Sequence, residues 1–462
     1  MTQTMRGGLE DLRAAIAGGV ITESDDRYEA ARKVWNAGFD RRPAVIVQCA
    51  SASDVAAALL FAQAHGLEIA VRGGAHSVSG HSVCDDGLII DLSPLNQVTV
   101  DPDAQRVRVE GGALLHDLDA ATQAHGLAVP AGIVGHTGVG GLTLGGGMGW
   151  LTRQAGLSID NLVSAQVIVA DGRILRAAED ENADLFWALR GGGGNFGIVT
   201  EFEFRLHEVG PIVQFGLFFW PQDQRTDALR LMRDVVAALP RSLNAIPAAA
   251  LNAPPAPFVP VEHQHEPGCA LLLAGFGDPA EHQQVVDRIR AALPPLFDHV
   301  EPMPYVALQQ LLDEANAWGF HGYDKGGYFE DLTDEVIEIL VDHAPRKGSP
   351  LSVALFYRLD QAYSEVGEDA TAFGGGRTPR YAGFFVGLCP TPEMLIAERE
   401  WVRSLWDALS PHMMSTGTYV NALPDEDQHR IRDTYGDKYD RLLAVKATYD
   451  PGNVFHRNAN IK

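Results

Sequence analysis

Residues 72–84 of this 462-residue chain read RGGAHSVSGHSVC. The tripeptide His-Ser-Val occurs twice in this stretch, five residues apart, and the stretch ends in Cys84. Paired glycines let a backbone adopt positive φ and approach a ligand closely, and free N–H groups in such loops bind phosphate. The preceding EIAVR has the character of a buried strand. The pattern therefore predicts a ligand-binding loop directly after a strand.

Two further segments are dense in glycine, GVGGLTLGGGMG at 138–149 and GGGGNFG at 191–197. The second contains G-x-G-x-x-G at Gly192, Gly194 and Gly197. A dinucleotide fingerprint follows a strand and opens a helix, whereas here the helical ADLFWALR precedes the glycines and the strand-like GIVTEFEFRL follows. The match is not a Rossmann fingerprint. Each loop alone is equally compatible with a tight connection, but together they indicate a diphosphate cofactor, and the lack of a Walker motif disfavours ATP or GTP.

Periodicity predicts an alternation of strands and helices between residues 43 and 209. A helix within 53–66 has Ser51 or Ser53 as its cap and ends at Gly66. A second helix occupies LLHDLDAATQAHG at 114–126, and NLVSAQVIVADGRILRA at 161–177 is typical of a hairpin that turns at Asp171-Gly172. Further strands are predicted in LIIDL, VTV and RVRVE.

The composition changes after about residue 210. Prolines cluster in IPAAALNAPPAPFVP at 246–260, and the strand-like runs FGLFFW, LLLAGF, SVALFYRL and YAGFFVGL are separated by helices. This pattern predicts a second domain with an antiparallel sheet covered by helices. The last 45 residues return to helices and polar turns. The fold class expected is α+β.

The net charge and the cysteine positions limit which binding partners and metal sites are expected. The chain has 60 acidic and 36 basic residues, a net charge of −24, which makes nucleic acid and anionic membranes poor partners. The cysteines, at positions 49, 84, 269 and 389, lie far apart without metal-ligand spacing, so no disulfide framework or metal site is expected. We see no signal peptide and no apolar run of about 18 residues, and we expect a cytoplasmic protein.

Five motifs give the chain a family resemblance. They are RGGAHSVSG, GHTGVGGLTLGGGMGWLTRQAGLSIDNL, DLFWALRGGGGNFGIVTEFEF, YVN at 419–421 and YDPGNVFHRNANI at 449–461. Through them nearly the whole chain resembles the berberine-bridge-enzyme-like FAD-linked oxidases, of the vanillyl-alcohol-oxidase superfamily with its PCMH-type FAD-binding domain. The resemblance implies an FAD domain of two α+β subdomains at 1–207, a substrate domain at 208–412, and a segment at 413–462 that returns to the FAD domain.

The resemblance implies that His76 bonds covalently to the flavin 8α-methyl carbon; the alternative is a histidine that only packs near the cofactor. Doubly linked relatives carry a cysteine where this chain has Val134, so a single link is expected. His81 is expected to hydrogen-bond or pack beneath the loop, and Cys84 to pack as a small apolar residue. Relatives commonly have glycine at the position of Ala75, and alanine there implies negative φ.

Two further residues are matched to roles in the reaction. Thr137 corresponds to the position on the dioxygen side of the flavin, where a small residue favours oxidase behaviour. Tyr419 corresponds to the active-site base, and its ordinary pKa of about 10 must be lowered by a positive charge or a hydrogen-bond partner. The alternative for Tyr419 is a wall residue. His136 is expected either to face the substrate or to support the loop from behind.

The resemblance implies a set of residues that contact FAD. They are Arg72, Gly73, Gly74, Ala75, His76, Ser77, Gly80, His81, Thr137, Gly138, Gly141, Leu142, Gly145, Gly146, Gly149, Ile198, Val199, Asn421, Asn458 and Asn460. The family's substrate contacts do not transfer, because TAFGGGRTPRY lacks the usual histidine and Arg377 is shifted. Either Tyr357 or Arg358 faces the pocket. The aromatic cluster at 318–323 lines a binding site or only packs as a loop, which is the favoured interpretation.

The leading functional hypothesis is an FAD-dependent oxidase that takes a hydride from a CH–OH or CH–NH carbon of a small molecule and reduces dioxygen to hydrogen peroxide. The first alternative is a dehydrogenase or cyclising tailoring enzyme of secondary metabolism that reacts poorly with oxygen. The second alternative is a flavin-binding protein without turnover. The substrate's identity is not determined by the motifs, and a monomer or homodimer is expected.

Overall fold

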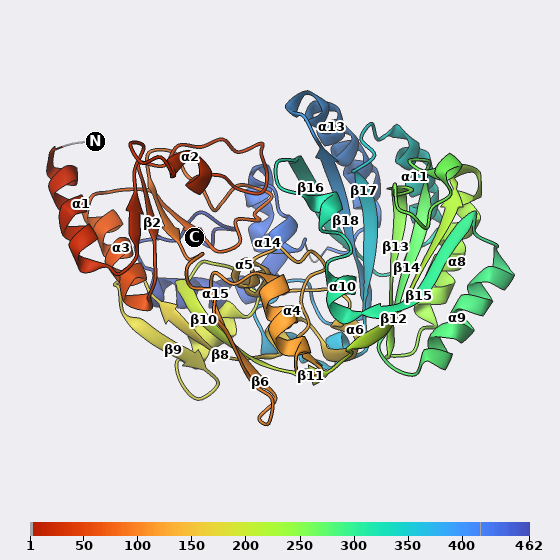
Figure 1. The fold of residues 1–462 in the computed structure, drawn as a ribbon, viewed down its shortest axis with the longest axis horizontal. Coiled ribbons are helices and arrows are strands. Elements are labelled where there is room, and N and C mark those ends of the chain that lie inside the picture. Colours follow the sequence, from red (N-terminus) through yellow and green to blue (C-terminus); the bar gives the residue numbers. More distant parts are fainter. Residues whose placement is uncertain (1–2, 416) are drawn as a thin grey trace.

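The half of the molecule that carries both chain ends contains two sheets (Figure 1). The computed structural model describes residues 3–415 and 417–462. The first sheet has the strand order β1-β2-β4-β3, with β2, β4 and β3 parallel and β1 antiparallel to β2. Its strands are β1 (Gly19–Ile21), β2 (Val45–Gln48), β3 (Ile69–Arg72) and β4 (Leu88–Asp91). The strand β3 ends where the first glycine loop begins, as predicted.

The second sheet is antiparallel and has the order β5-β6-β10-β8-β9. Its strands are β5 (Val98–Asp101), β6 (Arg106–Glu110), β8 (Leu162–Ile168), β9 (Ile174–Ala178) and β10 (Ile198–Arg205). The β8–β9 hairpin is confirmed, and Gly172 in its turn has φ of +83°. A short pair, β7 (Leu127–Ala128) with β11 (His207–Glu208), leads from this sheet toward the third.

The third sheet fills the other half of the molecule (Figure 1). It is antiparallel, with the order β15-β12-β14-β13-β17-β18-β16. Its strands are β12 (Ile212–Pro221), β13 (Leu243–Asn252), β14 (Pro267–Gly275), β15 (Phe297–Pro304), β16 (His321–Phe329), β17 (Val353–Leu359) and β18 (Arg380–Cys389). The expected antiparallel domain with helical cover is present.

Alternation along these strands separates two apolar cores. Phe218 and Trp220 point into a core shared with the covering helices, whereas Leu217 and Phe219 point into a core shared with the glycine-loop half.

The helices of the chain are α1 (Gln3–Ala15), α2 (Tyr28–Ala31), α3 (Ala52–Ala64), α4 (Leu115–Gln123), α5 (Val139–Gly145), α6 (Thr152–Ala155), α7 (Ala183–Leu189), α8 (Arg225–Ala237), α9 (Pro279–Ala292), α10 (Tyr305–Gln309), α11 (Asp334–His343), α12 (Ala362–Glu365), α13 (Pro392–Leu409), α14 (Ile431–Tyr435) and α15 (Tyr439–Tyr449).

Local signals in the sequence account for several boundaries. Ser51 caps α3 by accepting a hydrogen bond from the N–H of Asp54, which settles the choice between Ser51 and Ser53. Gly66, with φ of +63°, follows the end of that helix. The C-terminal helix α15 packs beside α7 in the core of the five-stranded sheet, together with Ile461. Among the described residues, no helix combines the length and apolar character needed to cross a membrane.

Two buried ion pairs join the halves of the molecule. The guanidinium of Arg153, in α6, donates to Asp360 at 2.6 Å and to the carbonyl of Leu243 at 2.7 Å. The guanidinium of Arg377, in the loop before β18, donates to both carboxylate oxygens of Asp160 at 2.7 and 2.8 Å. Both arginines are almost fully buried. The position of the third sheet relative to the glycine loops is therefore fixed by charged contacts as well as by apolar packing.

Candidate active site

The first two glycine loops touch through their backbones. A methyl group added at Gly74 would lie 2.3 Å from the nitrogen of Gly138, and one added at Gly138 would lie 2.3 Å from the nitrogen of Gly74. No side chain fits at such distances, so glycine is required at both positions. The second loop is in turn anchored to the start of α4, because the N–H of Leu115 donates to the carbonyl of Thr137 at 2.9 Å.

The first loop presents a row of free donors. Within the described parts of the chain, the backbone N–H groups of residues 74–79 form no hydrogen bond, although the carbonyls of Ala75 and Val78 accept bonds from Trp35 and Asn36. Buried or half-buried N–H groups are rarely left without a partner. A run of such donors after a strand is a site for an anion such as a diphosphate. The donor set thus fits the diphosphate of FAD.

His76 is held on two sides by rings. Its imidazole stacks on Trp35 with centroids 4.5 Å apart, and its Nε2 lies 3.0 Å from Nδ1 of His136. Burial, followed by the neighbouring His136, lowers the pKa of His76 to about 3. At neutral pH the imidazole is therefore uncharged, which is the nucleophilic form that a bond to carbon requires. Neither His76 nor His136 was expected to contact the other.

The expectation for Ala75 was wrong. Its φ is +55°, in the left-handed region, where an alanine costs roughly 1–2 kcal/mol. The side chain is buried in an apolar cluster that also contains Tyr28, Val83 and Cys84. Its carbonyl accepts a 3.0 Å hydrogen bond from Trp35. Packing and this bond hold a conformation that the backbone alone disfavours.

The remaining residues of the first loop mainly secure its shape. Arg72 donates to the carbonyl of Ala31 and lies 3.9 Å from Asp91, so its charge is engaged within the protein. The hydroxyl of Ser77 accepts a bond from the N–H of His81 at 3.2 Å. Gly80 has φ of +66°. Cys84 is buried, as expected, and burial raises the pKa of its thiol to about 11.

The second loop ends beside Tyr419. The hydroxyl oxygen of Tyr419 accepts hydrogen bonds from the N–H of Gly147 and from the side-chain amide of Asn421, both at 3.1 Å. The same amide donates to the carbonyl of Gly141 at 3.2 Å, and a methyl group at Gly145 would collide with it. Asn421 therefore ties α5 to the YVN segment. Gly141 itself has no atom within 4 Å of an added methyl group.

The expected lowering of the Tyr419 pKa does not occur in the protein alone. The ring is 8% exposed, and burial raises the pKa of its phenol despite the two hydrogen bonds, which act in the opposite direction. The ring of Phe384 meets that of Tyr419 edge-on, with the two centroids 6.0 Å apart, and the centroid of the Phe373 ring lies 6.4 Å from that of Tyr419. The neutral phenol faces the core beneath the third sheet, where Tyr357 packs against Phe384 at 5.5 Å.

The third glycine loop and the C-terminal tail meet at Asn195. Its amide donates to the carbonyls of Gly192 and Ala459, both at 2.9 Å, and its side-chain oxygen accepts from the N–H of Ile461. Asn458 and Asn460 lie on this tail, and Asn458 donates to the carbonyl of Phe455 at 3.1 Å. The contacts of Asn195 hold the tail against the third loop.

The other residues expected to contact FAD are either half-buried or buried. Thr137 and Leu142 are half-buried, and Val134 precedes them with its carbonyl bound to the N–H of Thr137. Gly146 has φ of +138° beside Phe373, and a methyl group at Gly149 would lie 1.9 Å from the carbonyl of Ala131. Ile198 and Val199 are buried in β10, where they pair with β8.

Packing shows where the side chains in and near the third sheet point. Tyr357 points toward the Tyr419 side of the sheet, whereas Arg358 lies over the ring of Tyr381 and bonds Asp360. Arg377 is a buried partner of Asp160. Of the aromatic cluster at 318–323, Trp318 is 43% exposed and Tyr323 is buried against arginines of α13, so the cluster does not form one site.

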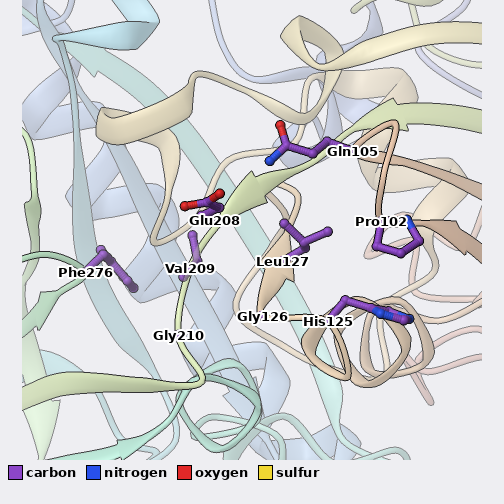
Figure 2. A pocket seen from close by; sticks show the side chains of 9 residues that line it. All are labelled: Pro102, Gln105, His125, Gly126, Leu127, Glu208, Val209, Gly210 and Phe276. Carbon is purple, nitrogen blue, oxygen red and sulfur yellow. The ribbon is translucent and has the colours of Figure 1, made fainter.

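A separate cavity lies where the chain passes into the third sheet. Figure 2 shows its side chains, with His125 and Pro102 on one side, Glu208 and Leu127 in the middle, and Phe276 on the other. Its volume is about 440 Å³. None of its lining residues belongs to the glycine loops or to the surroundings of Tyr419. The candidate active site is the junction of the three loops and is distinct from this cavity.

Sequence reasoning missed Trp35 and Asp313. Trp35 stacks on His76, and its indole N–H donates to the carbonyl of Asn316 at 2.6 Å. Asp313 accepts a 2.6 Å bond from the N–H of Gly135. Both lie far along the chain from the loops they contact and belong to no motif, so only the folded structure brings them to the site.

The fold and the loops define a PCMH-type FAD-binding oxidoreductase. Residues 43–178 match the family model for an FAD binding domain, and residues 418–462 match the model described as "Berberine and berberine like". An FAD-linked oxidoreductase of Dictyostelium discoideum is 30% identical over 452 residues, covering 97% of this chain and 95% of that protein. The chain therefore belongs to the berberine-bridge-enzyme-like family of FAD-linked oxidoreductases, and it is an enzyme.

Other relatives agree with this family. The (R)-6-hydroxynicotine oxidase of Paenarthrobacter nicotinovorans is 29% identical over 468 residues, covering 97% of each chain. The crystal structure of 6-hydroxy-D-nicotine oxidase from Arthrobacter nicotinovorans superimposes with a TM-score of 0.84 at 25% identity, over 97% of this chain and 98% of that one. BBE-like 1 of Physcomitrella patens gives 0.86 at 23% identity over 97% of each chain, a likeness that concerns the fold.

Proposed function

We propose that this enzyme is an oxidase whose FAD is bound through a single covalent link to His76. It removes a hydride from a CH–OH or CH–NH carbon of a small molecule, and dioxygen is reduced to hydrogen peroxide. The observation that carries the proposal is the first loop, in which an uncharged His76 is stacked in place next to six free backbone N–H groups. This combination offers a diphosphate site and a nucleophilic nitrogen side by side.

The residues at the junction fit FAD and divide its binding between them. The N–H groups of residues 74–79 would hold the diphosphate, and the open surface at Gly141 leaves room for the cofactor along α5. Asn195 and the tail from Phe455 to Ile461 close the third loop. When bound, FAD supplies a two-electron acceptor. Val134 has no sulfur, so a second link at that position is not available.

Tyr419 is the proposed proton acceptor. Hydride loss from an alcohol or amine must be accompanied by loss of a proton, and Tyr419 is the phenol at the inner end of the second loop. The N–H of Gly147 and the amide of Asn421 both donate to its oxygen, so they stabilise the phenolate that forms on ionisation. The surrounding Phe373 and Phe384 exclude water from this side of the ring.

Reaction with dioxygen is proposed from the residue at position 137. Thr137 lies between His136, which contacts His76, and Gly138, which contacts Gly74. A small side chain at this point leaves access to a flavin attached at His76. The names of two relatives, both hydroxynicotine oxidases, support oxidase chemistry and an amine among the substrates to be tried first.

The test is anaerobic reduction followed by exposure to air. The purified enzyme is screened with cyclic amines, aromatic alcohols and oligosaccharides for hydrogen peroxide production. With a substrate in hand, the enzyme is reduced without oxygen and then mixed with aerated buffer. We expect rapid return of the oxidised spectrum with one peroxide per turnover. Slow reoxidation by oxygen together with fast reoxidation by an artificial dye would contradict the proposal and identify a dehydrogenase.

A further inference from the structure

Asp324 is a buried acid on β16, an edge strand of the third sheet on the side of the glycine-loop half (Figure 1). Tyr323 and Phe329 of this strand point into the core shared with the covering helices, whereas Tyr328 points into the core shared with the glycine-loop half. Side chains alternate between the two faces of a strand. Asp324 therefore lies on the same face as Tyr328, toward the glycine loops.

Gly322 shares this face of β16 and is bound to the first glycine loop through Asn36. The N–H of Gly322 donates to the side-chain oxygen of Asn36 at 3.0 Å, and the amide of Asn36 donates to the carbonyls of Gly322 at 2.9 Å and of Val78 at 2.7 Å. A methyl group at Gly322 would lie 3.3 Å from the indole of Trp35, which stacks on His76. This end of β16 therefore adjoins the loop that carries His76.

Gly326, on the other side of Asp324, faces the start of the YVN segment. A methyl group at Gly326 would lie 3.1 Å from the hydroxyl of Thr418, which is buried and has no hydrogen-bond partner among the described residues. Gly326 pairs across the sheet with Phe384, whose ring meets that of Tyr419. Asp324 thus lies between the first glycine loop and the surroundings of Tyr419.

The carboxylate of Asp324 forms no ion pair within the described part of the chain. Lys325 extends to the opposite face of the strand, where it pairs with Asp427 and lies over the ring of Trp406. Burial raises the pKa of Asp324 to about 7, although its own backbone N–H and the charge of Lys325 act in the opposite direction. A buried carboxylate is stable in its ionised form only when a cation or several hydrogen-bond donors compensate its charge. A positively charged ligand group beside Asp324 would supply this compensation.

We propose that Asp324 binds a cationic amino group of the substrate, so that the substrates of this enzyme are amines rather than neutral alcohols or carbohydrates. The inference rests on the proposed function and names the substrate class of the same site. The ammonium group donates to the carboxylate, and a hydrogen bond between two charged groups is stronger than one between neutral groups. The hydroxyl of Thr418 offers a second acceptor on the same side of the sheet. Asp324 acts in recognition, and Tyr419 keeps the role of proton acceptor proposed above.

The test compares two probes of similar shape and different charge. The purified enzyme with its bound FAD is titrated without oxygen, at about pH 8, with benzylamine and with benzyl alcohol, and isothermal titration calorimetry measures both affinities. At this pH an alkylamine is cationic. We expect the unaltered enzyme to bind benzylamine at least about tenfold more tightly than benzyl alcohol, because the amine forms a close pair of opposite charges. Asp324→Asn keeps the shape of the side chain without its charge and should bind the two probes equally.

The matched control is Glu330→Gln, which removes an exposed carboxylate directly after the end of β16 and should keep the preference for benzylamine. Asp324→Ser supplies a second neutral variant should Asp324→Asn fail to fold. The inference is overturned if the unaltered enzyme binds neither probe or binds both equally. It is also overturned if the preference for benzylamine persists in the neutral variants.

The peroxide assay separates this inference from the proposed function. An enzyme that prefers benzylamine through Asp324 but makes no hydrogen peroxide with any amine would refute the proposed function and leave the ammonium site in place. An enzyme that makes peroxide from alcohols or oligosaccharides and shows no preference for benzylamine would remain an oxidase, and the role of Asp324 would be refuted.

Discussion

At the scale of single residues, the hydroxyl of Tyr419 links the second glycine loop to the YVN segment. It accepts from a backbone N–H and from Asn421, and no cation in the described structure hydrogen-bonds to it. Its raised pKa means that the phenol is neutral before substrate arrives. If Tyr419 acts as the proposed base, the transfer of the substrate proton depends on how well those two donors stabilise the phenolate.

Replacing Tyr419 with phenylalanine removes the proposed proton acceptor and leaves two donors unpaired. We expect Tyr419→Phe to lower the rate of anaerobic flavin reduction by at least about a hundredfold, within the range for loss of a general base. The enzyme should retain its yellow colour. Stopped-flow absorbance at the flavin band measures the rate.

The matched control is Tyr449→Phe, which removes a hydroxyl that donates to Asp184 beside α7 and α15. Both variants lose a hydrogen bond, but only Tyr419 lies at the proposed site. An unchanged reduction rate in Tyr419→Phe would leave this residue as a wall of the pocket and would require another base.

Some features of individual residues were predictable from the sequence and others were not. His76 was identified through the motif it belongs to, and Cys84 was correctly assigned to packing because its spacing matched no metal or disulfide pattern. The positive φ of Ala75 was not predictable, since it depends on a cluster and a bond from Trp35 that lie outside the loop. Trp35 itself was missed for the same reason.

At the scale of elements, the glycines at the start of α5 and inside it differ in how much space surrounds them. A side chain at Gly138, just before the helix, would collide with the backbone of Gly74, whereas one at Gly141 meets nothing. In the helix interior, alanine is favoured over glycine by roughly 0.5–1 kcal/mol. Gly138 is therefore needed for the fold, whereas Gly141 is not, and we propose that it leaves room for a ligand.

We expect Gly138→Ala to lower the thermal midpoint of the flavin-free protein, because two loop backbones must separate. Gly141→Ala should leave that midpoint unchanged or raise it slightly, and should weaken FAD binding instead. Differential scanning fluorimetry without flavin and titration with FAD measure the two effects. If Gly141→Ala binds FAD normally, the cofactor does not lie along α5.

The contact between α4 and α10 contains a buried acid. The carboxylate of Asp119 accepts one bond from the amide of Gln309 at 3.2 Å, and burial raises its pKa to about 7. In the unfolded chain an aspartate has a pKa of about 3.9. The folded state thus holds this proton more tightly, so folding takes up a proton between these two values and stability falls as the pH rises through that range.

Substituting Asp119 with asparagine should make the free energy of unfolding less dependent on pH. From pH 5 to pH 7 the unaltered protein should lose about 2 kcal/mol of unfolding free energy relative to Asp119→Asn, at roughly 1.4 kcal/mol per pH unit. Asp324, whose pKa burial also raises to about 7, adds a similar slope to both proteins and cancels in the comparison. Urea unfolding at several pH values measures the difference. If the free energy of unfolding changes equally with pH in both proteins, Asp119 is not protonated in the folded state.

Most elements were predictable because their signals are local. Alternation located β6 and β10, a capping serine at position 51 or 53 located the start of α3, and Asp171-Gly172 located the β8–β9 turn. The order of the strands in each sheet was not predictable, because β10 pairs with both β6 and β8 across long stretches of chain. The helix α1 and strand β1 carry weak patterns and were not predicted.

At the scale of the whole molecule, two buried arginines connect the glycine-loop half to the third sheet. Arg153 binds Asp360 and the carbonyls of Leu239 and Leu243, and Arg377 binds Asp160. Without Arg153, its buried carbonyl partners lose their donor, at a cost of about 1–3 kcal/mol for each unpaired group, whereas Asp360 keeps its ion pair with Arg358. Such pairs hold the third sheet in place relative to the glycine loops.

We expect Arg153→Met to lower the urea midpoint markedly and to uncouple the two halves, so that fluorescence and circular dichroism no longer report the same transition. Arg173→Ala, which breaks an exposed pair with Asp171, serves as the control and should change stability by less than about 0.5 kcal/mol. Equal effects of the two substitutions would contradict the role of the buried pair.

Prediction from sequence was weakest in the half of the molecule that contains the third sheet. Its sheet and helices were predicted, yet the positions of Tyr357, Arg358 and Arg377 required the structure, since each depends on which face of the sheet meets the loops. Arg377 proved to be structural. The half that contains the glycine loops, in contrast, is defined by motifs whose glycines are held to short backbone distances.

The covalent link to His76 is the central claim, and one measurement tests it most directly. The purified protein is denatured, separated from small molecules and weighed intact, together with His76→Ala and His81→Ala. We expect the unaltered protein and His81→Ala to carry the mass of one FAD at a single attachment point, and His76→Ala to carry none. Free FAD released from the unaltered protein, or attachment that persists in His76→Ala, would contradict the account.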